Sequence, residues 1–147
     1  MVRLARLDDL DAVNRIVRGA YSRYVERLGM EPGPMLDDYG QRIKAGQAWV
    51  IEDAGSVAGL LVLVDADRAL LLDNIAVDPA AQGRGLGKML MTFVEDEARR
   101  RGRAEVQLYT NVLMIENVAL YQRLGFSETN RVTEKGYQRV YMTKALS

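Results

Sequence analysis

A change of hydrophobic period around a glycine-rich turn constrains the fold of this chain more than any other feature. Residues 69–77 read Ala-Leu-Leu-Leu-Asp-Asn-Ile-Ala-Val, an apolar run of strand length that ends at Asp78-Pro79. From Gly85 to Arg101, apolar residues recur at helical spacing, at positions 86, 89, 90, 93, 94 and 98. The sequence therefore predicts a strand, a turn and a long amphipathic helix in succession, a unit typical of α/β folds.

The turn itself has the properties of an anion-binding loop. It reads Gln82-Gly83-Arg84-Gly85-Leu86-Gly87-Lys88. Its three glycines allow a tight bend and a close approach of backbone to ligand. They stand where the following helix exposes unpaired N–H groups and the positive end of its dipole. This pattern favours a phosphate-binding loop, with added charge from the Arg and the Lys. A glycine-rich turn that merely begins a helix is the alternative.

Two other phosphate-binding motifs do not fit this loop. A P-loop requires Gly-x-x-x-x-Gly-Lys-Ser/Thr, whereas Gln82 occupies the first glycine position and Met89 follows Lys88. A dinucleotide-binding fingerprint requires Gly-x-Gly-x-x-Gly directly after the strand, whereas this chain has Gly-x-Gly-x-Gly after a short turn.

The rest of the sequence predicts further alternation of helices and strands. A helix with Asp8 as its N-cap has apolar positions that continue to Leu28. A second, short helix is expected at residues 36–45. The strands are expected at 2–7, 48–53, 57–65, 69–77, 105–110, 126–129 and 138–144, and another helix at 115–124. The predicted architecture is one α/β sandwich around a mixed sheet, with residues 1–147 as a single domain.

Composition narrows the functional classes. Twenty basic and twenty acidic residues cancel, so the surface offers no general attraction to nucleic acid or to anionic lipid. No apolar stretch reaches the roughly 18 residues of a membrane span, and the N-terminus does not read as a signal peptide, so we expect a cytoplasmic protein. The chain has no Cys and no His, which removes the thiolate nucleophile and the usual neutral-pH base and makes a metal site unexpected.

The glycine-rich turn resembles the Gln/Arg-x-x-Gly-x-Gly/Ala signature of the GNAT (Gcn5-related) N-acetyltransferases. Two more segments are similar to characteristic segments of that family, in the same order: Asp-Asn-Ile-Ala-Val-Asp-Pro at 73–79 and Ala-Leu-Tyr-Gln-Arg-Leu-Gly-Phe at 119–126. The resemblance implies a three-layer α/β sandwich whose mixed, mostly antiparallel sheet splits between the fourth and fifth strands. It also implies an enzyme that transfers acetyl from acetyl-CoA (coenzyme A) to a primary amine of a small molecule or a protein, without a metal.

The resemblance also assigns the residues that bind acetyl-CoA. Main-chain groups of Ile75 and Val77, with Ala76 between them, would contact the pantetheine arm. This requires the strand at 69–77 to part from the strand at 105–110, because paired neighbours have no spare N–H or C=O. The pyrophosphate would lie against the loop formed by Gln82, Gly83, Arg84, Gly85, Leu86, Gly87 and Lys88.

Tyr121 is the catalytic residue that the resemblance implies. It would protonate the departing thiolate of coenzyme A, a transfer between groups with ordinary pKa values of about 10 and about 8.5. The alternative is an aromatic residue that only faces the core. Many relatives carry an Asn seven residues earlier, where this chain has Met114. Our hypothesis is that Asn117, on the same helical face as Tyr121, supplies that polar contact, the alternative being a capping or surface residue.

The general base stays open at this point. An amine with a pKa near 10 is protonated at pH 7, and leaving it neutral costs about 4 kcal/mol. Some relatives place a Glu on the strand after the long helix, where this chain has Tyr109, a poor base. Asp73, Glu116 and a chain of waters are the candidates. The alternation of a strand places Asp73 on the same side as Ile75, although an Asp at a strand end is commonly just solvated.

Acceptor specificity is expected from the first helix and its following loop, residues 21–39. Glu26, Glu31, Asp37 and Asp38 can attract a cationic amine there, or can form the solvated face of two helices. The acceptor itself is not readable from the sequence. Two alternatives also stay open, a catalytically silent coenzyme A-binding module and an enzyme that uses a longer acyl group. A homodimer through residues 126–129 and 138–144 is compatible with the sequence but not required by it.

Overall fold

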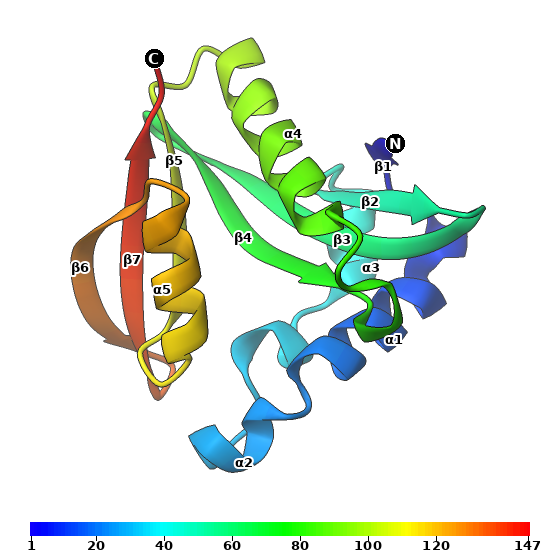
Figure 1. The fold of residues 1–147 in the computed structure, drawn as a ribbon, viewed down its shortest axis with the longest axis horizontal. Helices are drawn as coiled ribbons and strands as arrows, with labels where there is room; N and C mark the ends of the chain where they lie inside the picture. The colour runs from blue at the N-terminus through cyan, green and yellow to red at the C-terminus, as the bar shows by residue number, and fades with distance from the viewer.

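A computed structural model describes all residues from Met1 to Ser147 and contains one seven-stranded sheet in the order β1-β2-β3-β4-β5-β7-β6 (Figure 1). All neighbouring strands are antiparallel except β4 and β5, which run parallel. The strands are β1 (Val2–Leu4), β2 (Ala48–Asp53), β3 (Ser56–Ala66), β4 (Ala69–Val77), β5 (Glu105–Asn111), β6 (Ser127–Glu134) and β7 (Tyr137–Ala145). The helices are α1 (Leu10–Tyr21), α2 (Tyr24–Leu28), α3 (Tyr39–Lys44), α4 (Leu86–Arg100) and α5 (Ile115–Arg123).

Helices cover both faces of the sheet, so the predicted three-layer sandwich is confirmed. Strand β3 is buried on both sides, and its successive residues enter two different clusters. Leu60 and Val62 pack with α1 and α3, whereas Leu61 and Leu63 pack with α4 and α5. This explains why β3 reads as a continuous apolar run and not as an alternating one.

The sheet splits between β4 and β5, as expected. These strands pair only from Ala69 opposite Glu105 to Leu72 opposite Leu108. Beyond that point the two strands diverge, and α4 and α5 lie on either side of the opening (Figure 1). The split starts at a bulge, since Val62 on β3 faces Asn74 whereas Leu63 faces Leu72. Asp73 is therefore the extra residue of β4, which bends the strand away from its neighbour.

The prediction of one long first helix capped by Asp8 is wrong. A 3₁₀ turn (Leu7–Asp9) precedes α1, and the chain turns at Ser22 before α2 begins. The carboxylate of Asp9 accepts hydrogen bonds from the Arg6 amide at 2.7 Å and the Arg3 guanidinium at 2.8 Å. Asp9, and not Asp8, therefore joins the end of β1 to the start of the helix.

Other boundaries also differ from the prediction. Strand β1 ends at Leu4 and not at residue 7, because the 3₁₀ turn already begins there. Helix α3 begins only at Tyr39, because Asp38 is its N-cap and accepts from the Gln41 amide at 3.1 Å. The last two strands are longer than predicted and form a hairpin around Lys135 and Gly136, whose φ angles of 51° and 83° suit a two-residue turn. None of the helices combines the length and the apolar character that a membrane crossing requires.

Candidate active site

Three adjoining cavities open where β4 leaves β5. The first is a groove of about 410 Å³ between α1, α4 and α5. The second is a narrow throat of about 50 Å³, and the third is an acceptor-side cavity of about 180 Å³ under the loop before α3. Four residues line both groove and throat, namely Tyr21, Ile75, Asn117 and Tyr121. The throat shares Asp73, Tyr109 and Arg139, among others, with the acceptor-side cavity. The three cavities thus form one passage through the split.

The glycine-rich loop lies at one end of the groove. Gly83 and Gly85 have φ angles of 84° and 77°, which disfavour any residue with a side chain. Gly85 is the N-cap of α4, so the amides of the first turn have no partner within the helix. A Cβ placed on Gly83, Gly85 or Gly87 would meet nothing within 4 Å, which leaves the concave side of the loop open. Gln82, Gly87 and Lys88 line the groove.

The two cations of this loop behave differently. Arg84 forms an ion pair of 2.6 Å with Asp53 at the end of β2, which directs its guanidinium toward the β2–β3 hairpin. Lys88 forms no ion pair and lines the groove. Arg23 also lines the groove and forms no ion pair, so Lys88 and Arg23 supply the positive charge within the groove. Arg84 does not line it.

The main chain of β4 offers hydrogen-bonding groups to the split. The Asp78 amide donates to the Ala58 carbonyl at 2.8 Å. Since antiparallel residues alternate between bonding and not bonding to the partner strand, Ile75 and Val77 direct their amides and carbonyls away from β3. The Tyr21 hydroxyl donates to the Ile75 carbonyl at 3.0 Å. The amide of Ile75 and the main chain of Val77 stay free for a ligand.

Tyr121 belongs both to the core and to the passage. Its ring packs edge-on against Phe126, with centroids 6.0 Å apart, and the residue is only 9% exposed. Its hydroxyl makes no hydrogen bond within the protein, and the residue lines both groove and throat. Burial raises the pKa of Tyr121 to about 12. The hydroxyl is therefore protonated at neutral pH and available as a donor.

Asn117 lies beside Tyr121 at the junction of groove and throat. Its side-chain amide donates weakly to the sulfur of Met114, at 3.7 Å, and it caps no helix end. Glu116 points elsewhere, because its carboxylate pairs with Arg27 at 2.5 Å and lines none of the three cavities. That ion pair lowers the pKa of Glu116 to about 2. Glu116 is therefore wrongly placed for the general base.

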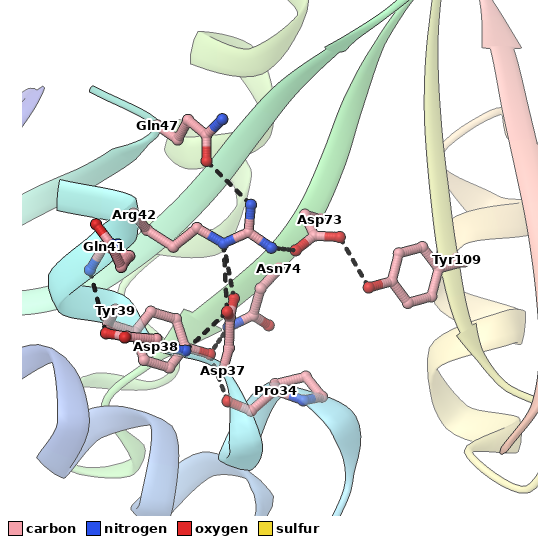
Figure 2. Close-up of polar contacts among 10 residues, drawn as sticks. All are labelled: Pro34, Asp37, Asp38, Tyr39, Gln41, Arg42, Gln47, Asp73, Asn74 and Tyr109. Atoms are coloured by element: carbon pink, nitrogen blue, oxygen red, sulfur yellow. Dashed lines mark hydrogen bonds and ion pairs between the residues drawn. The ribbon is translucent and has the colours of Figure 1, made fainter. Parts of the chain in front are cut away.

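Asp73 is held at the point where the strands part (Figure 2). Its carboxylate accepts from the Arg42 guanidinium at 2.9 Å and, across the split, from the Tyr109 hydroxyl at 2.8 Å. Arg42 also binds Asp37 at 3.0 Å and Gln47 at 3.0 Å. Burial, followed by the charge of Asp73, raises the pKa of Tyr109, which makes this tyrosine an even poorer base. Asp73 keeps access to the throat and to the acceptor-side cavity.

A model of the family described as "Acetyltransferase (GNAT) domain" matches residues 44–128. The chain belongs to the GNAT acetyltransferase family. It is 30% identical over 135 residues to the uncharacterized N-acetyltransferase YjgM of Escherichia coli, over 86% of this chain and 81% of that protein. It is 41% identical over 76 residues to the alanine N-acetyltransferase of ribosomal protein bS18 from Salmonella typhimurium, over 52% of this chain and 51% of that protein.

Solved structures share the fold of this GNAT acetyltransferase. The ribosomal-protein-S18-alanine N-acetyltransferase of Escherichia coli superposes with a TM-score of 0.76 and 23% identity, over 100% of this chain and 94% of that one. The acetyltransferase yncA of Salmonella typhimurium, determined with acetyl-CoA, superposes with a TM-score of 0.72 and 22% identity, over 100% of this chain and 94% of that one. The chain is accordingly an acetyl-CoA-dependent N-acetyltransferase, and its acceptor is an amine.

The groove fits the acetyl donor of GNAT acetyltransferases. An anion can approach the open loop and the free amides at the start of α4, and an extended amide-bearing chain can lie along Ile75 and Val77. The groove leads from there to Tyr121. The structure holds no cluster of three or more His, Cys, Asp or Glu side chains arranged to bind a metal ion.

Sequence reasoning missed a polar chain on the acceptor side. The Tyr21 hydroxyl donates to the Asn74 carbonyl oxygen at 2.6 Å, and the Asn74 amide donates to the Tyr39 hydroxyl at 2.9 Å. Tyr39 donates in turn to the carbonyl of Pro34 at 2.6 Å. The signal was an Asn inside an apolar strand, since a buried amide needs partners. Of the four acidic residues proposed to attract an amine, only Asp37 lines a cavity, and Arg42 already pairs with it.

Proposed function

We propose that this acetyltransferase moves the acetyl group of acetyl-CoA directly onto a primary amine in the throat where β4 leaves β5. One observation carries the proposal. Tyr121 presents a protonated hydroxyl with no protein partner at the junction between the groove and the throat. A general acid must hold its proton at neutral pH and must have its hydroxyl free to reach the departing thiolate.

The donor would be held mainly by main-chain groups. Free amides of the loop and of the first turn of α4 suit a pyrophosphate, and Lys88 adds charge. Ile75 and Val77, with Ala76 between them, would pair with the pantetheine arm as an added strand does. Asn117 would supply a polar contact next to Tyr121. Bound acetyl-CoA brings an activated thioester carbonyl to the throat.

Tyr121 and Asp73 would divide the proton transfers. As the amine nitrogen bonds to the acetyl carbon and the carbon–sulfur bond breaks, Tyr121 gives its proton to the sulfur. Asp73 accepts the proton that the nitrogen loses, directly or through water. It is a carboxylate on the acceptor side of the throat with lone pairs beyond those that Arg42 and Tyr109 occupy. The amide product and the free thiol therefore form without net uptake of protons.

Replacement of Tyr121 by Phe tests the chemical role. We expect turnover to fall by about 10²–10⁴-fold, with the affinity for acetyl-CoA nearly unchanged. Thiol release with a panel of amines and calorimetry with coenzyme A measure the two quantities. Tyr141→Phe is the matched control, because that hydroxyl binds Glu134 and lines none of the cavities. A silent coenzyme A-binding module would bind the nucleotide but release no thiol with any amine, and preferential use of propionyl- or succinyl-CoA would indicate a longer acyl group.

We also propose that residues 1–147 form one domain that acts in the cytoplasm. One continuous sheet from β1 to β6 supports the single domain. A homodimer would use the free edge of β6, now placed at Ser127–Glu134, where main-chain groups lack a partner strand. Sedimentation velocity over a range of concentrations tests that association.

A further inference from the structure

Arg139 differs from the other half-buried arginines of the protein in its hydrogen bonding. The burial pattern includes five half-buried arginines, at positions 3, 42, 101, 103 and 139. The first four all donate hydrogen bonds to carboxylates or carbonyls. Arg139 makes no hydrogen bond of ordinary geometry with the protein, although its side chain is only 14% exposed. A guanidinium with five donors and little water around it favours an anionic partner.

The protein contacts of Arg139 position the guanidinium but do not satisfy it. The charged group lies 4.4 Å from the ring centroid of Tyr109 and 5.6 Å from that of Tyr137. The nearest carboxylate oxygen belongs to Glu134, at 3.5 Å. That oxygen already accepts from the Tyr141 hydroxyl at 2.6 Å, and the Glu134 side chain is 42% exposed. The aromatic rings therefore position a guanidinium that lines both the throat and the acceptor-side cavity.

Arg139 lies on the acceptor side of the reaction centre. It lines the throat and the acceptor-side cavity, together with Asp73. One aromatic ring separates the two groups, because the face of Tyr109 contacts Arg139 and its hydroxyl binds Asp73. A ligand that reaches both groups needs an anion at one end and a nitrogen only a few bonds away.

The other charged residues of the acceptor-side cavity are also compatible with an anionic ligand. Arg42 is neutralised by Asp37 and Asp73. Lys135, in the turn before β7, lines the same cavity and forms no ion pair. The lining of this cavity thus carries three cations, Arg42, Lys135 and Arg139, against the two carboxylates Asp37 and Asp73. Since both carboxylates are held by Arg42, the side chains of Arg139 and Lys135 are the cations left to attract an anion. A carboxylate matches a single guanidinium in shape and charge, through two parallel hydrogen bonds.

We infer that the acceptor is a small amino acid-like molecule, and that Arg139 binds its carboxylate while the amine is directed into the throat. This inference rests on the proposed function of the same site. Arg139 would be a specificity-determining residue, since it touches the substrate at a distance from the reacting atoms.

Matched acceptors test the inference on the unaltered enzyme. Thiol release is measured with amino acids, with their amides, with the corresponding decarboxylated amines and with short peptides, each over a range of pH to correct for the ionisation of the amine. We expect kcat/KM to be at least about tenfold higher for the carboxylate-bearing acceptors. Propionate, which lacks the amine, should inhibit competitively against the acceptor and not against acetyl-CoA.

Substitution of Arg139 gives the second arm. Arg139→Gln should lower kcat/KM for amino acids by about tenfold to a hundredfold, mainly through KM, and should leave the amides unchanged. Arg139→Lys should restore part of the loss. Arg131→Gln is the matched control, because this exposed arginine of β6 pairs with Glu128 and lines none of the cavities. Unchanged binding of coenzyme A by calorimetry shows that each variant is folded.

The outcomes separate this inference from the proposed function. Three results would overturn the inference and leave the acetyl transfer standing. The first is equal rates with amides and amino acids, and the second is a preference for peptides or for aminoalkyl phosphonates. The third is an equal loss of kcat/KM for both acceptor types in Arg139→Gln. Absence of thiol release with every amine would overturn the proposed function itself.

Discussion

Asp73 shows how a single side chain can be both anchored and reactive. Its carboxylate is fixed by Arg42 and Tyr109, yet it reaches the throat. We expect Asp73→Asn to lower turnover near pH 7 by about 10²–10⁴-fold, and the loss to shrink toward high pH, where more of the amine is already neutral. Steady-state rates of both proteins between pH 6 and about 10 measure this loss of turnover and its dependence on pH. Asp37→Asn is the control, because Asp37 binds the same arginine outside the throat.

Equal activity of Asp73→Asn and the unaltered enzyme at neutral pH would assign the base to water. A uniform loss across the pH range would instead indicate that Asp73 serves to position its neighbours. Neither result depends on the identity of the acceptor, so any amine that releases thiol can be used.

Strand β4 and helix α4 could be predicted closely from the sequence, whereas only the first residues of β6 could be. The first two carry strong apolar patterns and are buried, so local periodicity and tertiary packing agree. Strand β6 reads Ser-Glu-Thr-Asn-Arg-Val-Thr-Glu and is mostly exposed at the sheet edge. Only its pairing with β7 makes it a strand, and pairing is a long-range property.

The bulge at Asp73 and the contacts of Arg42 were also out of reach of the sequence. Asp73 binds residues 31 and 36 positions away, on α3 and β5. By contrast, Tyr121, Asn117 and the glycine-rich loop were placed together at the groove, because each lies next to an element whose period was clear. Local patterns and the family resemblance thus located the lining of the groove, whereas the contacts of Asp73 depend on long-range pairing.

Gly87, the second residue of helix α4, lies where the helix itself does not require a glycine. Gly87 lies in the first turn, has an ordinary helical φ and has open space where a Cβ would be. We expect Gly87→Ala to stabilise the protein by about 0.5–1 kcal/mol and to weaken the binding of acetyl-CoA, because the methyl group would enter the groove. Urea denaturation and calorimetry measure the two effects. An increase in stability with unchanged affinity would show that Gly87 is not a contact.

The C-terminal turn of α4 carries a buried charge whose effect on stability depends on pH. Glu97 is 6% exposed, and hydrogen bonds from Arg100 and then Arg101 lower its pKa to about 2. The stabilisation is present above the unfolded-state pKa of about 4.5 and is lost as the pH falls toward 2. We expect Glu97→Gln to cost about 1–3 kcal/mol at pH 7 and almost nothing near pH 2. The exposed Asp96→Asn, on the same turn, should have little effect at either pH.

The split sheet makes the molecule sensitive to the ionisation of its tyrosines. Two groups of strands, β1–β4 and β5–β7, share only four paired residues of β4. Around the opening lie Tyr21, Tyr39, Tyr109 and Tyr121, and burial raises the pKa of each above the usual 10. A passage that excludes enough water to hold a neutral donor therefore also disfavours tyrosinate in the folded state.

This arrangement predicts a loss of stability at alkaline pH. Because the folded-state pKa values are raised, the contribution of these tyrosines is fully present below the unfolded-state value near 10, and it declines as the pH rises through the folded-state values. For Tyr121, with a pKa of about 12, the decline between pH 10 and 11 is about 1 kcal/mol.

Urea denaturation at fixed pH values measures this decline in stability, and the ultraviolet absorbance of tyrosinate reports ionisation directly. Over the same pH range, the free energy of unfolding of Tyr121→Phe should fall by about 1 kcal/mol less than that of the unaltered protein. Titration of all seven tyrosines near pH 10 in the folded protein would show that water reaches the throat freely and would contradict the burial of the Tyr121 hydroxyl.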